Sequence, residues 1–216
     1  MTPTVSVVVV SRKRPDDLRR CLVALRQLYY PSLEIVIVAD SASLRGLEPF
    51  PGLKAIAFDA PNISAARNTG AAAAGGEILA FIDDDAVPEP TWLDHLAAPF
   101  ADGDVAASGG YVLGRNGLSL QWGGLCLDQR GVSHPLDPGA GDAPRVLSTA
   151  PGQRAIRTQG TNMAIRRDVL AALGGFDEAF HWYHDDADLN LRIAEAGHLT
   201  AVVPRVAIVA EAALNR

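Results

Sequence analysis

The sequence contains few cysteines, no long hydrophobic run and no excess of positive charge. Its two cysteines, Cys21 and Cys126, belong to no CxxC pair or Cys/His cluster, so a zinc site is not expected. Such cysteine usage is typical of a reducing compartment. The longest apolar runs, such as Val5 to Val10, are far shorter than the roughly 20 residues that a membrane-spanning helix needs, and no signal peptide is recognisable. We therefore expect a cytoplasmic protein whose membrane contact, at the inner face, is at most peripheral.

Positive charge is outnumbered by negative charge. Lys and Arg together number 19 and Asp and Glu 25, which gives a net charge of −6 and a pI of about 5.3. This balance argues against a broad basic surface, so no nucleic-acid partner is expected. With 216 residues, 48% of them hydrophobic, the chain can bury a large core without disulfides, and residues 1–216 are predicted to form a single domain.

Strands and helices alternate in the first half of the sequence. Val5 to Val10 is a short, β-branched and wholly apolar run, typical of a strand covered on both faces. Further strands are expected over residues 33–38, 53–58 and 77–82. The first helix is expected from Pro15 up to Pro31, the second from a cap at Asn62 or Ser64 up to residue 75, and the third over residues 88–100. In the last of these helices, Thr91 and Asp94 have capping-box-like spacing.

The second half is less regular. Residues 109–160 are rich in Gly, Pro and Asp, with a strand or short helix over 119–127 and a mobile loop expected around 115–158. Order returns with a strand over 161–165, helices over 168–173 and 185–196, and two late strands over 199–203 and 206–209 split by Pro204. The whole pattern predicts an α/β fold with a mostly parallel, doubly wound central sheet and helices on both faces.

Three consecutive aspartates follow the fourth expected strand. Asp83, Asp84 and Asp85 repel one another unless a cation neutralises them, and hard divalent cations prefer oxygen ligands. Asp83 and Asp85 should point the same way in an extended loop, while Asp84 points elsewhere, toward a sugar hydroxyl. A merely solvated acidic turn is the alternative. Asp40 follows the second expected strand, and ligands of open α/β sheets bind at the carboxyl ends of the strands.

A second acidic cluster begins a late helix. Asp185 can be explained as a residue favoured by the helix dipole, and Asp188 as the partner of Arg192 at i, i+4. Asp186 has no such explanation and is the best candidate for a general base. The preceding residues 181–184, His-Trp-Tyr-His, suit carbohydrate binding and an ordinary half-buried loop almost equally.

Together these segments resemble the family 2 glycosyltransferases, which have the GT-A fold, over nearly the whole chain. Six motifs carry the resemblance, in the order of that family: residues 5–15 (VSVVVVSRKRP), 38–43 (VADSAS), 66–70 (ARNTG), 82–85 (IDDD), 160–164 with 174–178 (GTNMA, GGFDE), and 184–192 (HDDADLNLR). The DDAD form is similar to that of galactofuranosyltransferases, although four residues do not fix a sugar.

The resemblance implies an inverting, metal-dependent transfer of a sugar from a UDP-, GDP- or dTDP-linked donor to a hydroxyl of a glycan, lipid-linked or other acceptor. It implies that residues 1–110 bind the nucleotide sugar and residues 111–216 the acceptor. The implied site comprises a base, Asp186; contacts to the donor nucleotide from Asp40, Arg67, Asn68, Asp83 and Asp84; and Mn²⁺ or Mg²⁺ on Asp83 and Asp85.

The chain departs from the family near its end. Many relatives have a further metal-binding His shortly after the proline of the late strand, where this chain has Ala210 and Glu211. A catalytically impaired nucleotide-binding relative is therefore one alternative function. A sugar-phosphate nucleotidyltransferase is another, disfavoured because the turn after the first strand, residues 11–15, lacks glycine.

Overall fold

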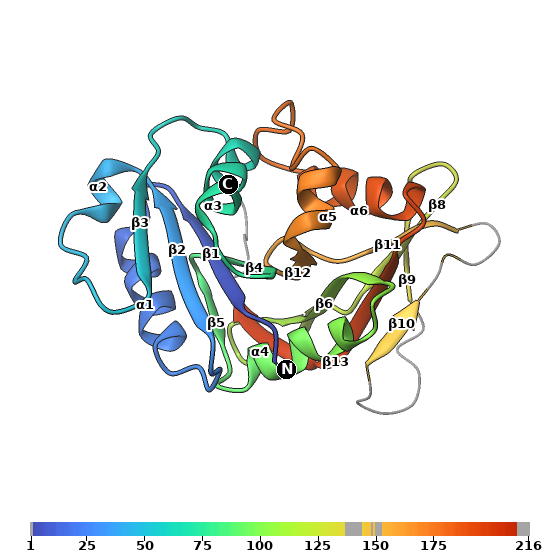
Figure 1. Ribbon diagram of the computed structural model, residues 1–216, viewed down its shortest axis with the longest axis horizontal. Helices are drawn as coiled ribbons and strands as arrows, with labels where there is room; N and C mark the ends of the chain where they lie inside the picture. The colour runs from blue at the N-terminus through green and yellow to red at the C-terminus, as the bar shows by residue number, and fades with distance from the viewer. Residues whose placement is uncertain (1, 137–143, 148, 150–152, 211–216) are drawn as a thin grey trace.

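The computed structural model describes residues 2–136, 144–147, 149 and 153–210. A ten-stranded sheet forms the centre of the molecule, with helices packed on both faces (Figure 1). The predicted fold class is confirmed. Within the described residues, no helix is both long and apolar enough to cross a membrane.

Four parallel strands make one half of the sheet. They lie in the order β3 (Leu53–Ala57), β2 (Leu33–Ala39), β1 (Val5–Ser11) and β4 (Ile78–Asp83). The interiors of β1, β2 and β4 are almost fully buried, as their unbroken apolar runs predict. Because the strands are parallel, the residues that follow β1, β2 and β4 lie along one edge of the sheet.

One reversed strand joins this half to the other. β12 (Asn162–Arg166) lies between β4 and β6 (Val105–Leu113) and runs antiparallel to both, while β13 (Leu199–Ala210) runs parallel to β6. The start of β12 therefore meets the end of β4 at the edge where ligands are expected. Short antiparallel strands complete the sheet: β5 (Ala86–Pro88), β7 (Leu120–Trp122) and β10 (Arg145–Leu147).

The helices bury two separate apolar layers. On one face, α1 (Pro15–Leu25) and α4 (Trp92–Ala97), which continues as a 3-10 helix (Ala98–Ala101), contribute side chains such as Leu18 and Trp92. On the other face, α3 (Ile63–Ala73), α5 (Arg167–Ala172) and α6 (Asp185–Glu195) contribute Ala66, Leu170 and Leu189. The short α2 (Ser41–Leu44) follows β2. Asn62 caps α3 by accepting a hydrogen bond from the N–H of Ala65, as expected.

A second, three-stranded sheet lies beside the main one, as the right of Figure 1 shows. It consists of β11 (Gln153–Arg157), β8 (Leu125–Asp128) and β9 (Ser133–Pro135). The mobility expected over residues 115–158 stays a prediction, but the structure contains the strands β7 to β11 in the described part of that segment. Their alternation is hidden in the sequence because these strands have only three to five residues each, too few for a clear period.

Other element boundaries also differ from the prediction: α1, for example, ends at Leu25 rather than at Pro31. The helix expected from residue 88 begins only at Trp92, because Ala86–Pro88 pairs with β13 instead, and Thr91 makes no side-chain capping bond. Pro204 does not divide the last strand, because β13 absorbs it in a register shift between Val203 and Ala207. Glu211, the substitute considered for the late His, lies outside the described residues.

Candidate active site

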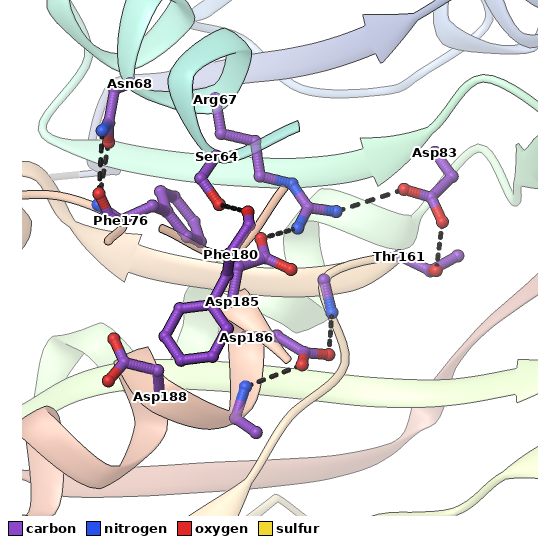
Figure 2. Close-up of polar contacts among 12 residues, drawn as sticks. Ser64, Arg67, Asn68, Asp83, Thr161, Phe176, Phe180, Asp185, Asp186 and Asp188 are labelled. Atoms are coloured by element: carbon purple, nitrogen blue, oxygen red, sulfur yellow. Dashed lines mark hydrogen bonds and ion pairs between the residues drawn. The ribbon is translucent and has the colours of Figure 1, made fainter. Parts of the chain in front are cut away.

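Sheet topology brings Asp83 and Thr161 together. Asp83 is the last residue of β4, and Asn162 of the antiparallel β12 pairs with Ile82. Thr161 therefore lies opposite Asp83, and its hydroxyl donates a hydrogen bond to Asp83 Oδ2 (Figure 2). No sequence motif pointed to this contact, because it depends on the direction of β12.

A cavity of about 320 Å³ opens at this edge of the sheet. Asp83, Asp85 and Asp186 all line it, so these acids, which the family resemblance implies for one site, lie around one cavity although they are far apart in the sequence. The other lining residues are Arg14, Ile63, Arg67, Val112, Gln121, Arg157, Gln159, Gly160, Thr161, Trp182, Tyr183, His184 and Asp185. The cavity thus combines carboxylates, guanidinium groups and aromatic rings.

Asp85 is paired with an arginine that precedes α1. Arg14 Nη1 lies 2.7 Å from Asp85 Oδ2, and Arg14 Nη2 lies 2.8 Å from Asp84 Oδ1. Burial and the neighbouring carboxylate of Asp83 raise the pKa of Asp85 against the opposing effect of Arg14. Burial by itself would lower the pKa of Arg14, but Asp84 and Asp85 raise it above its ordinary value.

Asp84 points into the protein rather than into the cavity. Its side chain is fully buried and accepts a hydrogen bond from the Ser11 hydroxyl at 2.6 Å. Burial raises the pKa of Asp84 to about 7, against the effects of Ser11 and Arg14. The expected contact of Asp84 with a sugar does not fit this position, because alternation along the chain turns it to the opposite side from Asp83 and Asp85.

Arg67 forms the centre of a buried ionic network. From α3, it contacts Asp185 at the start of α6 and Asp83 at the end of β4, the latter at 3.3 Å (Figure 2). Its guanidinium also lies over the Phe176 ring, 5.6 Å from the centroid. Asp185 is 3% exposed, so its place at the helix start serves an ion pair and not only the helix dipole. The approach of Arg67 requires glycine at position 160, where a Cβ would come within 2.6 Å of Arg67 Nη2.

Asp186 faces the cavity and is held on both carboxylate oxygens. The N–H of Gly160 donates to Oδ2 at 3.1 Å, and Arg157 Nη2 lies 3.2 Å from Oδ1. Arg157 in turn lies over the Trp122 ring, 5.0 Å from the centroid. Arg157 belongs to β11, a strand absent from the sequence prediction, so its role was missed.

Asp188 and the aromatic residues that precede α6 have different surroundings. Asp188 pairs with Arg192 at 2.7 Å, as the i, i+4 spacing predicts, and lies apart from the other carboxylates in Figure 2. Trp182 and Tyr183 line the cavity, with 55% and 73% of their surfaces exposed. His184 adopts a left-handed backbone, φ 70°, which turns the chain sharply into α6.

The two other residues expected to bind the nucleotide hold secondary structure elements together. Asp40 caps α2, and its carboxylate accepts hydrogen bonds from the N–H groups of Lys13, Ala42 and Ser43 and from the Ser43 hydroxyl. Although burial opposes it, these donors lower the pKa of Asp40 to about 2. Asp40 does not line the cavity described above.

Asn68 likewise turns away from the cavity. Its side-chain amide donates to the Phe176 carbonyl at 2.9 Å and accepts from the Phe176 N–H at 2.8 Å, a reciprocal pair that Figure 2 shows. It also donates to Glu178. The ARNTG motif thus serves two purposes: Arg67 reaches the cavity, while Asn68 fastens α3 to the segment that leads to α6.

Asp83 and Asp85 are the carboxylates that could hold a cation. Both face the cavity, Asp83 with a third of its side chain exposed, and a hard cation accepts such oxygens. Within the described part of the chain no group of three or more His, Cys, Asp or Glu side chains is arranged for a metal. The two aspartates could supply two of a cation's ligands.

Comparison with known proteins agrees with this architecture. One solved structure with the same fold is a mannosyltransferase from Pyrobaculum calidifontis in complex with GDP-Man and Mn²⁺, at 20% identity and a TM-score of 0.69; the match covers 97% of this chain and 57% of that one. Another is GalNAc-T7 with UDP, GalNAc and Mn²⁺, at 19% identity and a TM-score of 0.76; the match covers 97% of this chain and 44% of that one. The fold is thus that of the GT-A glycosyltransferases.

The family follows from the sequence comparison. The model of glycosyl transferase family 2 matches residues 6–174, and the chain belongs to this family. It is 32% identical over 209 residues to the O-antigen biosynthesis protein RfbC of Myxococcus xanthus, covering 91% of this chain and 16% of that protein. It is 31% identical over 201 residues to the pre-mycofactocin glycosyltransferase of Mycobacterium tuberculosis, covering 89% and 39%. The chain therefore spans well under half the length of both relatives.

Proposed function

We propose that this chain transfers a sugar from a nucleoside diphosphate sugar to an acceptor hydroxyl with inversion at the anomeric carbon. The observation that carries the proposal is the position of Asp83, Asp85 and Asp186 around one cavity. Family membership supports the donor class, as do GDP-Man in one related structure and UDP with GalNAc in another. RfbC supports glycan assembly as the setting. Residues 1–110 would bind the donor and residues 111–216 the acceptor.

Asp186 is the proposed general base. It accepts the proton of the acceptor hydroxyl while that oxygen attacks the anomeric carbon and the bond to the diphosphate breaks on the opposite face. The Gly160 N–H and Arg157 fix both carboxylate oxygens, so the base is oriented before the acceptor arrives. The exposed rings of Trp182 and Tyr183 offer apolar faces to a sugar at the rim of the cavity.

Asp83 and Asp85 are the proposed ligands of Mn²⁺ or Mg²⁺. A cation held there would offset the negative charge that builds on the departing diphosphate. Arg67 contacts Asp83 and so helps to hold it in position, and its guanidinium adds positive charge to the lining of the cavity. We do not extend the proposal to Asp40, Asp84 or Asn68, whose polar groups are taken up by the protein itself.

Asp186→Asn tests the assignment, with Asp188→Asn as the matched control on the same helix. Nucleoside diphosphate release and product formation are measured with a panel of nucleotide sugars and acceptors, and binding of the donor by calorimetry. We expect Asp186→Asn to lower kcat by ~10²–10⁴-fold with donor binding retained, and Asp188→Asn to change kcat little. Full transfer by Asp186→Asn would remove this residue from the role, and a product with the donor's anomeric configuration would exclude inversion.

A further inference from the structure

Each proposed metal ligand already has a guanidinium partner. Asp83 lies 3.3 Å from Arg67, and Asp85 lies 2.7 Å from Arg14. A divalent cation attracted to the same oxygens therefore meets positive charge that the chain itself supplies. The two arginines differ in how easily they can yield.

Arg67 cannot leave its position cheaply. It is 5% exposed, is bound to the buried Asp185 and is stacked on Phe176. Its contact with Asp83 is long, and one third of the Asp83 side chain stays exposed. Asp83 can consequently accept a cation while Arg67 remains where it is.

Arg14 is more accessible on its cavity side. Its side chain is 36% exposed, it precedes α1 without capping the helix through its side chain, and it lines the cavity beside Asp85. Its second nitrogen, Nη2, lies 2.8 Å from the fully buried Asp84, so Arg14 can release Asp85 through Nη1 while the contact with Asp84 is kept. Because Nη1 of Arg14 lies 2.7 Å from Asp85 Oδ2, a cation held by Asp85 would compete with this contact.

We propose that Arg14 and the divalent cation compete for Asp85, and that Nη1 of Arg14, once released from Asp85, contacts the diphosphate of the donor while Nη2 stays on Asp84. This inference rests on the metal site of the proposed function. The exchange keeps positive charge against Asp85, leaves Nη2 of Arg14 on the buried Asp84, and frees Nη1 for a phosphate oxygen of the donor. Arg14 is thus assigned to donor binding, a role that its basic turn, residues 11–15, did not specify.

The test compares Arg14→Gln and Arg14→Lys with Arg19→Gln, a control on the exposed side of α1 whose arginine pairs with Asp16. Binding of Mn²⁺ alone is followed by electron paramagnetic resonance, and binding of UDP, GDP and dTDP at saturating Mn²⁺ by calorimetry. We expect Arg14→Gln to bind Mn²⁺ about fivefold more tightly, the ratio that a partly exposed ion pair can supply, and to bind the diphosphates more weakly than the natural chain. Arg14→Lys should fall between them, and Arg19→Gln should change neither constant.

Opposite changes in the two affinities cannot come from general damage to the fold, which weakens both. Equal Mn²⁺ affinity in Arg14→Gln and the natural chain, or unchanged diphosphate affinity, would overturn the inference. Asp85→Asn separates this outcome from failure of the proposed metal site. If that variant keeps full Mn²⁺ affinity, the site itself is misassigned; if it loses affinity while Arg14→Gln gains none, only the competition is wrong.

Discussion

Arg67 and Asp185, which are 118 positions apart in the sequence, form a buried ion pair between two helices. The pair joins α3, in the first half of the chain, to the start of α6, and a further contact ties it to Asp83 at the end of β4. One guanidinium therefore fixes the position of the proposed metal ligand relative to the helix that carries the proposed base.

Loss of one member of this pair should be costly. Arg67→Met leaves the Asp185 carboxylate buried without its counter-charge, and we expect the free energy of unfolding to fall by ~3–5 kcal/mol. Asp185→Asn should also destabilise the protein. Because both substitutions remove the same interaction, the double variant should lose less than the sum of the two. Urea unfolding of the four proteins measures this coupling, and strict additivity would mean that the pair contributes nothing.

A single methyl group at position 160 should disturb the site. In Gly160→Ala the new Cβ would lie 2.6–2.9 Å from the atoms of the Arg67 guanidinium, which is held on two sides and cannot withdraw freely. We expect a loss of ~1–3 kcal/mol in stability and a clear loss of transfer activity. Gly103→Ala is the matched control, because nothing lies within 4 Å of its Cβ. Equal behaviour of the two variants would contradict the packing argument.

Arg157 should act through Asp186. Arg157→Gln removes the contact at 3.2 Å to the proposed base but leaves the Gly160 N–H in place. We expect kcat to fall by about tenfold, less than the ~10²–10⁴-fold that a positioned base supplies, while the affinity for the donor changes little. Arg154→Gln, on the same strand in an exposed pair with Glu195, serves as the control. Steady-state kinetics with donor and acceptor varied separately would show whether kcat or KM responds, and a change in donor affinity alone would argue against a positioning role.

Glu34 should make stability depend on pH. Burial raises the pKa of this carboxyl, but hydrogen bonds from Lys54, Ser6 and the N–H of Gly75 outweigh it and lower the pKa to about 2. Because the folded-state pKa lies below the ordinary value of 4.5, the carboxylate stabilises the fold above pH 4.5, and this contribution disappears as the pH falls toward 2. Since water screens the pair with the half-exposed Lys54, we expect this contribution to be about 1–2 kcal/mol at neutral pH.

The measurement compares urea unfolding of the natural chain and Glu34→Gln between pH 7 and pH 3. The difference in unfolding free energy should be largest at pH 7 and shrink on acidification. Lys54→Gln should reduce the contribution, since it removes the partner 2.8 Å from Glu34 Oε2. A difference that stays constant over this range would refute the assigned linkage.

The sequence by itself determined the central strands, the α/β class and the chemistry available at the site. Buried strands such as Val5–Ser11 and Ile78–Asp83 are continuous apolar runs, and periodicity and local composition report directly on burial. The position of acids directly after strands predicted that Asp40 shares a crevice with Asp83 and Asp85, but Asp40 does not line the cavity. The presence of Asp186 there was implied by the family resemblance.

Only the tertiary structure decided which polar groups are used up within the protein. Asp84 is buried against Ser11, Asp40 caps α2, and Asn68 binds Phe176, although all three lie in motifs that suggested ligand contacts. Thr161 and Arg157 enter the site because β12 reverses direction and β11 joins a separate sheet. The type of a residue determines which hydrogen bonds it can donate or accept. Its actual partner depends on which distant strand ends beside it in the fold, and the spacing of residues along the sequence does not contain that information.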